Sequence, residues 1–396
     1  GRGDRHHAMI AQCCMDIASP TPLLGGLAPA EFMRRHWQKK PLLIPAAVPD
    51  ARALVDRAAL FDLAARDDVE SRVVVREGAY WSLRHGPFAR RALPALKQPA
   101  WTLLVQGTDL HLDAAHRLLQ RFRFVPDARL DDLMLSFATD GGGVGPHIDS
   151  YDVFLLQLHG RRRWKFGRAP APRLRSDVPL KMLANFVPSE EWLLDPGDML
   201  YLPPGWAHDG VAEGPAITAS IGFRSAGSTS LGLDVLQHLL DAVEPPDEES
   251  RYADPRQRAA TEPARIPAAL QHYADASVAR LLEDRHARDR ALGETLSEPK
   301  AGVWFDAAAP LAAGAALRLD RRTRMLYDDR HVYINGDSYR AAGRDATLVR
   351  RLADRRVLAP RDVAALSGEA RDLVGQWIAA GWLRGDVETC DQEPRK

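Results

Sequence analysis

The chain of 396 residues has few cysteines, no long apolar run and no net charge. Its three cysteines, Cys13, Cys14 and Cys390, lie near the two ends without CxxC spacing, so they predict neither a disulfide framework nor a cysteine zinc site. No run of about 18 apolar residues is present, which excludes a transmembrane helix. The stretch up to Met15 lacks the apolar core of a signal peptide. We therefore expect a soluble, cytoplasmic chain without a membrane partner.

Charge of one sign is also lacking, since 53 lysines and arginines are balanced by 53 aspartates and glutamates. A neutral chain has no overall attraction for nucleic acid or for an anionic membrane. Any nucleic-acid contact would need a local basic patch. What the sequence has in quantity is apolar residues, 45% of the total, which is typical of a globular protein with a sizeable core.

The length predicts two or three domains at about 150 residues each. Residues 1–19 are interpreted as a disordered start or a cloning remnant. Residues 20–244 hold short apolar runs between Gly and Pro turns, a pattern that favours a β-sandwich or barrel over βαβ units. The expected strands are 42–44, 101–106, 133–139, 153–158, 163–167, 198–202 and 217–223.

The pattern changes after residue 244. Residues 245–312 predict a charged, Pro-bearing linker and then a helix over 268–290, which packs on other helices or on a second subunit. Residues 313–396 combine two short strands, an Asn335-Gly336 turn, two helices and a terminal Trp382-Leu383-Arg384 segment without an assigned secondary structure. This order resembles a winged-helix domain.

The most informative stretch contains a His-x-Asp motif. In a β-strand, residues i and i+2 point to the same face, so His147 and Asp149 present an imidazole and a carboxylate to one point. His208 follows a Pro-Pro-Gly turn 208 − 147 = 61 residues later, which leaves room for strands that return beside the first pair. Two histidines and one carboxylate form the facial triad of non-haem Fe(II) oxygenases. The sequence therefore predicts metal ligation by His147, Asp149 and His208.

A second His-x-Asp motif occurs at His111 and Asp113. It leads into DAAHRLLQRF, which has a helical pattern, and on a helix residues i and i+2 point about 200° apart. We therefore do not expect this copy to chelate a metal.

A facial triad leaves three metal positions open, enough for O₂ and a bidentate co-substrate. If that co-substrate is 2-oxoglutarate, its distal carboxylate needs a cation, and arginine suits it best because the planar guanidinium is bidentate. The run Arg161-Arg162-Arg163 supplies candidates, and the Ser136 hydroxyl could add a hydrogen bond. Taken alone, the same run is more often a solvated strand edge.

Three stretches together resemble the bacterial JmjC-type ribosomal oxygenases, relatives of the cupin-like histidine and arginine hydroxylases of ribosomal proteins. They are HWQKKPLLI from His36, SFATDGGGVGPHIDSYDVFLLQLHGRRRWKFG from Ser136, and PGDMLYLPPGWAH from Pro196. Upstream of His36, members of this family have a PGLAPAEF-type opening. This sequence departs slightly from it, because Leu24-Gly25-Gly26-Leu27 precedes Ala28-Pro29. The resemblance extends over nearly the whole chain.

The resemblance implies a mainly β fold with helices. Its parts are a catalytic domain over 20–244 with a JmjC/cupin-type double-stranded β-helix barrel at about 100–228, a linker and helical dimerisation region over 245–312, and a winged-helix domain over 313–396. It also implies Fe(II) at His147, Asp149 and His208.

The family further implies 2-oxoglutarate held by Arg162 and Ser136, with O₂ as the second co-substrate. The expected reaction is hydroxylation of a side-chain carbon in a ribosomal protein. The bacterial members act at C-3 of an arginine in the sixteenth protein of the large subunit. An arginine substrate needs a carboxylate partner, and we expect Asp140, just before the glycine turn, to serve, although it is equally well interpreted as a turn residue.

Two other functions compete with this one. The chain could be a winged-helix nucleic-acid or ribosome-binding protein whose barrel is not catalytic. Alternatively, the barrel could be a cupin isomerase or dioxygenase that uses its metal without 2-oxoglutarate. Release of succinate that depends on a substrate peptide separates the first function from both alternatives.

Overall fold

The structure is a computed structural model that describes residues 16–243 and 250–386. Most of the expected disordered start and all three cysteines therefore lie outside the described residues. The described chain forms two compact units, one up to Ser225 and one from Ala226 onward, with Gly302–Trp304 grouped with the first. Among the described residues, no helix is both long and apolar enough to cross a membrane.

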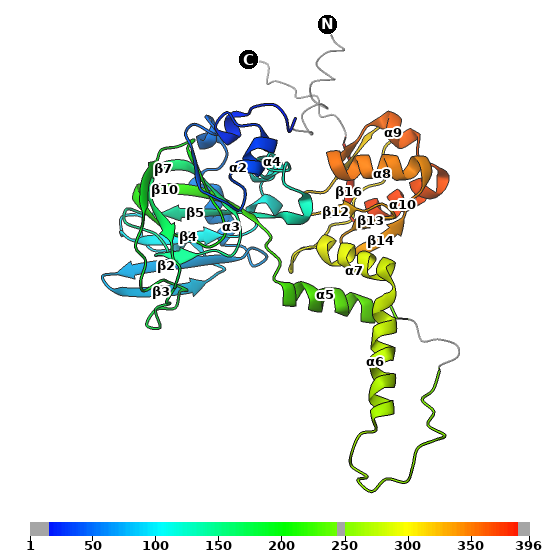
Figure 1. Ribbon diagram of the computed structural model, residues 1–396. Helices are drawn as coiled ribbons and strands as arrows, with labels where there is room; N and C mark the ends of the chain where they lie inside the picture. Colours follow the sequence, from blue (N-terminus) through cyan, green and yellow to red (C-terminus); the bar gives the residue numbers. More distant parts are fainter. Residues whose placement is uncertain (1–15, 244–249, 387–396) are drawn as a thin grey trace. The chain divides into compact units, whose positions relative to one another are not determined.

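The first unit is built on a ten-stranded antiparallel sheet in the order β1-β9-β7-β10-β5-β4-β2-β3, with β6 added to β10 and β8 to β7 (Figure 1). This is the expected mainly β architecture, a JmjC/cupin-type double-stranded β-helix. The strands are β1 Leu42–Ile44, β2 Ser71–Glu77, β3 Tyr80–His85, β4 Trp101–Val105, β5 Leu130–Ala138, β6 His147–Ile148, β7 Val153–Arg168, β8 Glu190–Leu194, β9 Met199–Leu202 and β10 Trp206–Phe223.

Two strands are longer than the sequence predicts. The expected strands 153–158 and 163–167 form one strand, β7, and β10 begins at Trp206 rather than at Ile217. At Gly160, with φ +63°, the register to β10 shifts because residues 214–216 of β10 lie opposite this single residue, and β7 continues through it. Arg161-Arg162-Arg163 therefore lies in the middle of a strand.

The two faces of the sheet bury different cores. One face packs with the helices α2 Pro29–Arg35, α3 Arg57–Ala64 and α4 Asp113–Gln120 around aromatic residues such as Phe122 and Phe154. The other face buries Trp164 and Phe166 with leucines of β8 and β9. Because side chains alternate along a strand, neighbouring residues of β7 and of β9 belong to different cores.

The second His-x-Asp motif lies outside the sheet. His111 ends a short 3₁₀ helix over Thr108–Leu110, and Asp113 is the first residue of α4. The predicted helix is confirmed from Asp113 onward, but His111 and Leu112 precede it, and the backbone of Leu112 is extended, with φ −115° and ψ 123°.

The second unit begins with helices and ends with a winged-helix arrangement. The expected helix 268–290 is two helices, because the Asp284 side chain accepts hydrogen bonds from the N–H groups of His286 and Ala287 and caps a new helix. The Asn335-Gly336 turn has positive φ at both residues and joins two strands as predicted.

The elements of this unit are α5 Ser228–Asp241, α6 Ala268–Glu283, α7 Arg285–Ser297, β11 Ala316–Leu319, β12 Met325–Tyr327, β13 His331–Ile334, β14 Asp337–Arg340, α8 Gly343–Arg355, β15 Val357–Leu358, α9 Pro360–Ala364, α10 Gly368–Ala379 and β16 Leu383–Asp386. Helix α5 packs on α7, and the His238 Nε2 lies 3.1 Å from Oε1 of Glu298.

Candidate metal centre

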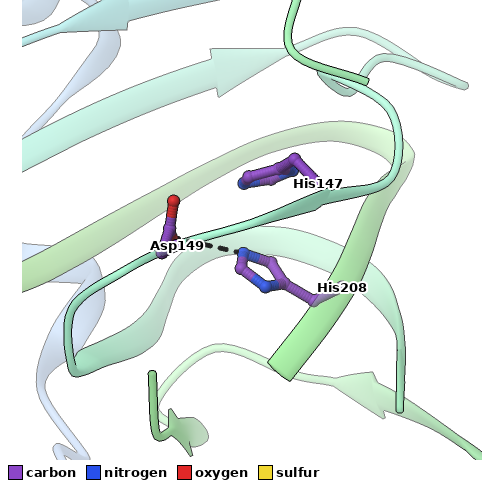
Figure 2. A group of neighbouring side chains, drawn as sticks. All are labelled: His147, Asp149 and His208. Carbon is purple, nitrogen blue, oxygen red and sulfur yellow. Dashed lines mark ion pairs between the residues drawn. The ribbon is translucent and has the colours of Figure 1, made fainter. Parts of the chain in front are cut away.

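The side chains of His147, Asp149 and His208 lie around one point (Figure 2). Strand β6 pairs with β10 so that His147 lies directly opposite His208, and their ring centroids are 4.2 Å apart. Asp149 follows two residues after His147, and its Oδ2 lies 3.6 Å from Nε2 of His208. One candidate ligand atom from each residue lies within 4.8 Å of the other two. Ligands at about 2.1 Å and 90° around an ion are about 3 Å apart, so the group fits one small cation.

Backbone carbonyls orient both imidazoles. Nδ1 of His147 lies 2.9 Å from the Gly145 carbonyl oxygen, and Nδ1 of His208 lies 3.0 Å from that of Trp206. A carbonyl oxygen only accepts, so each Nδ1 carries the proton and donates it. Each Nε2 is then left with a free lone pair, which is the state required of a metal ligand.

Burial shifts the pKa values of His208 and Asp149. Burial, reinforced by the neighbouring His147, lowers the pKa of His208 to about 3, so its ring is neutral at any physiological pH. Burial also raises the pKa of Asp149. A dication at the centre would oppose this second effect, because it stabilises the carboxylate.

The glycine-rich turn before His147 is required by close backbone approach. A Cβ on Gly143 would lie 2.5 Å from the carbonyl oxygen of Gly210 on β10. Gly145 has φ +77°, a conformation that side chains disfavour, and it packs against the Met182 side chain. The glycines therefore allow β6 to lie close against β10.

A buried cation lies on the same sheet face as His208. Going along β7 from Phe166, which is opposite His208, every second residue shares this face, so Trp164 and Arg162 follow. Trp164 lies between His208 and Arg162. The ring centroids of Trp164 and His208 are 5.9 Å apart, and Cζ of Arg162 lies 5.7 Å from the Trp164 ring centroid. Four residues of strand from Phe166 to Arg162 correspond to about 13 Å.

The Arg162 guanidinium has unsatisfied donors. Its side chain is buried, with 5% exposure, and Nε and Nη2 have no hydrogen-bond partner among the described residues. Burial lowers its pKa to about 10, although nearby Asp209 opposes the shift. Leaving a charged group buried and unpaired is costly, so this geometry points to an anionic ligand outside the chain.

The other two arginines of the run have different surroundings. Arg161 and Arg163 point to the opposite, exposed face of β7 and both pair with Glu213, and Arg163 also pairs with Glu191. Alternation along one strand therefore separates one buried arginine from two solvated ones. The solvated strand edge describes Arg161 and Arg163, and the candidate cation for a carboxylate is Arg162.

Ser136 lies on the same sheet face as Arg162, and small residues lie beside it on this face. It is buried on β5, and its hydroxyl donates to the Thr218 carbonyl oxygen over a long 3.4 Å. Two residues further on, Ala138 packs against Ala212, which lies directly opposite Arg162. Ala138 and Ala212 thus connect the serine and the arginine along this face.

Asp140 is placed elsewhere. Its side chain is exposed, and its Oδ1 accepts a hydrogen bond of 2.8 Å from the N–H of Gly214. Gly214 is six residues beyond His208 along β10, about 20 Å of strand. The structure does not bring Asp140 to the candidate ligands, and its part in binding a guanidinium stays a prediction.

Two residues next to the motif escaped the sequence analysis. Tyr151 lies near Asp149 and lowers the pKa of its carboxyl group, against the effect of burial, and the alternation His147, Asp149, Tyr151 was a signal for it. Asp152 is fully buried and accepts hydrogen bonds from Tyr201 Oη at 2.6 Å and Gln38 Nε2 at 3.0 Å. A charged residue directly before an apolar strand was the signal for this anchor, which fixes the chain just after the candidate ligands.

Known proteins resemble the chain in sequence and in structure. A JmjC domain model matches residues 117–231, and a ROXA-like winged-helix model matches residues 280–384. The ribosomal protein uL16 3-hydroxylase of Escherichia coli K12 is 38% identical over 208 residues, which cover 51% of this chain and 54% of the relative. The chain thus spans about half the length of the curated relatives it matches.

Solved structures match over a longer stretch. An X-ray structure of E. coli YcfD has a TM-score of 0.80 at 27% identity and covers 91% of this chain and 98% of its own. The ribosomal oxygenase YcfD in complex with cobalt and 2-oxoglutarate has a TM-score of 0.76 at 27% identity, and covers 91% and 99%.

Fold and site together define a JmjC-type double-stranded β-helix domain followed by a winged helix. In sequence and in structure, the chain is similar to JmjC-domain ribosomal oxygenases.

Proposed function

We propose that this protein is an Fe(II)- and 2-oxoglutarate-dependent oxygenase that hydroxylates a side chain of a large-subunit ribosomal protein, at C-3 of an arginine. The observation that carries the proposal is the buried guanidinium of Arg162, unpaired among the described residues, on the sheet face of His208. The name of the uL16 3-hydroxylase supports the substrate, and the YcfD complex with cobalt and 2-oxoglutarate supports the co-substrate.

In this proposal His147, Asp149 and His208 hold the iron, and Arg162 and Ser136 hold the distal carboxylate of 2-oxoglutarate. The two ends of a dicarboxylate need a metal at one end and a cation at the other, and β7 offers both on one face. When bound, iron and 2-oxoglutarate together activate O₂ for insertion into a C–H bond, with release of CO₂ and succinate.

The chain's own residues then have to bind the metal and the substrates, orient them and exclude water. The carbonyls of Gly145 and Trp206 fix the two imidazoles, and Tyr151 lies near the carboxylate of Asp149. His208 is only 2% exposed, so bulk water has little access to that side of the centre. No proton transfer by a protein acid or base is needed, so positioning of one C–H bond is the main requirement.

The test is turnover on a peptide from the ribosomal protein, with Fe(II), 2-oxoglutarate and air. We expect succinate in proportion to peptide, and a peptide heavier by one oxygen atom at an arginine. Binding of nucleic acid without succinate would favour a non-catalytic barrel, and peptide-independent chemistry without succinate would favour a cupin isomerase or dioxygenase. Mass spectrometry of ribosomal proteins from cells with and without the gene gives the cellular counterpart.

We also propose that the protein acts as a homodimer in the cytoplasm. Apolar side chains that are 38–61% exposed recur along α5 and α6; they are Leu233, Leu236, Leu240, Leu270, Val278 and Leu281. Exposed rows of this kind on neighbouring helices favour burial by a second copy. Light scattering should give twice the chain mass, and L236D/L240D should give the mass of one chain.

A further inference from the structure

A segment of the first unit lacks acidic residues altogether. From Gly78 to Thr108 the sequence has no aspartate or glutamate, although the whole chain has 53 in 396 residues. The same segment carries four cations, Arg84, Arg90, Arg91 and Lys97, and all four are exposed. A neutral chain thus contains a local excess of positive charge.

Three of these arginines form one surface. Nη2 of Arg84 donates to the carbonyl oxygen of Ala92 at 3.1 Å, and Ala92 belongs to the 3₁₀ turn Arg90–Ala92 that carries the other two. This surface lies beside β3, the edge strand of the sheet (Figure 1). We call Arg84, Arg90, Arg91 and Tyr80 the basic edge.

Aromatic rings lie against two of the guanidinium groups. Cζ of Arg84 lies 5.5 Å from the centroid of Phe88, and Cζ of Arg90 lies 4.1 Å from that of Phe61. A guanidinium stacked on a ring keeps its N–H donors at its rim, and its side chain has already lost conformational freedom. Such a group is prepared to bind a phosphate.

The basic edge differs from the other basic run of the sheet. On β7, Arg161, Arg163 and Lys165 each form an ion pair with Glu191 or Glu213. Within the described ranges, the arginines of the basic edge have no such carboxylate partner. Positive charge is thus unpaired at the basic edge and paired on β7.

We propose that the basic edge binds RNA. Its arginines would contact backbone phosphates, and Tyr80, which is 68% exposed and shares the strand face of Arg84, would stack on a base. The proposal rests on the proposed function for its natural ligand, because a ribosomal protein substrate is a partner of ribosomal RNA.

The basic edge and the metal centre use opposite faces of the sheet. Arg84 pairs across β2 and β4 with Val73, Leu103 and then Phe137, the neighbour of Ser136 on β5. Neighbours on a strand face opposite sides, so Arg84 and Ser136 do not share a face. RNA at this edge would leave the face of the candidate ligands open to the polypeptide.

The test measures binding of a fluorescent oligouridylate of about 20 nucleotides to the full chain as salt is varied. We expect R90A/R91A to weaken binding about tenfold at low salt and to reduce the slope of log K against log salt by about 1.4, since two phosphate contacts are lost. The matched control is R34A/R35A, an adjacent pair on α2 in which Arg35 already pairs with Glu31 at 2.7 Å, and it should change binding less than twofold. Y80A should weaken binding about fivefold without changing the slope.

Three results would overturn the proposal: no binding by the wild-type chain at low salt, equal losses in the two arginine pairs, or competition by polyglutamate as strong as that by RNA. Turnover of the free peptide is measured on the same proteins, and R90A/R91A should match the wild type. A wild-type chain that binds RNA but releases no succinate would refute the proposed function alone.

Discussion

Two buried charges, one in each unit, are treated in opposite ways. Arg162 and Asp320 are each 5% exposed. Asp320 accepts hydrogen bonds from the backbone N–H and Nε of Arg322 at 3.0 and 2.8 Å, and its Oδ2 lies 2.7 Å from Nη2 of Arg384. Burial alone would raise the pKa of Asp320, but these arginines hold it below its ordinary value.

Arg162 has no comparable partner among the described residues, and burial lowers its pKa. A charge that serves the fold is paired within the fold, whereas a charge that serves a ligand is left unpaired until the ligand arrives. By this comparison, Asp320 is a structural charge and Arg162 is a binding charge.

The largest effect is expected from Arg162→Met. Loss of the cation should lower kcat/KM for 2-oxoglutarate at least 100-fold, because a charge-assisted bidentate contact is removed. The melting temperature should stay the same or rise, since an unpaired buried charge is replaced by an apolar side chain. Succinate release and thermal unfolding measure the two outcomes, and a large loss of stability would mean that Arg162 is structural.

Asp320→Asn should show the reverse pattern. Its two arginine partners would lose their counter-charge in a buried setting, so we expect a loss of about 3 kcal/mol in the free energy of unfolding. Succinate release per folded molecule should be unchanged. Asp372→Asn, at an exposed position on α10, is the control and should change stability by less than about 0.5 kcal/mol.

A smaller effect concerns the pH dependence of the metal-free protein. Because the pKa of His208 is about 3 in the fold and about 6.5 when unfolded, the unfolded state binds the proton first. The stability contributed by neutral His208 is therefore complete above pH 6.5 and is lost as pH falls towards 3. At pH 5 the loss is about 2 kcal/mol. Denaturant unfolding of wild type and His208→Asn should show a difference that narrows on acidification; a constant difference would contradict the assignment.

The smallest effect is expected from Arg163→Gln, one residue from Arg162 but on the solvated face. Arg163 is 38% exposed in its side chain and forms surface ion pairs, which contribute little to stability. We expect nearly unchanged stability and wild-type turnover. A loss of turnover like that of Arg162→Met would remove the distinction between the two faces of β7.

The positions of the candidate ligands could be predicted because local rules fix them. Residues i and i+2 of a strand share a face whatever the rest of the fold does, so His147 and Asp149 follow from spacing. His208 needed only a returning strand beside them. The structure brings the three together, and their role as ligands stays a prediction.

Other features depended on long-range pairing and could not be read from the chain. The sequence could not say which arginine of the run is buried, because that depends on the register of β7 against β10, set by Phe166 opposite His208. In the sequence, Gly160 was interpreted as the end of a strand, because a glycine is typical both of turns and of register shifts within a strand. The surroundings of Asp140 depended on the distant Gly214.

The most direct test of the central claim is calorimetric titration of the Co(II)-loaded protein without O₂, with 2-oxoglutarate and with pyruvate, which lacks the distal carboxylate. The wild type should bind 2-oxoglutarate at least 100-fold more tightly than pyruvate, and Arg162→Met should lose that preference while it still binds pyruvate. Equal affinities in the wild type, or a preference that survives in Arg162→Met, would contradict the account.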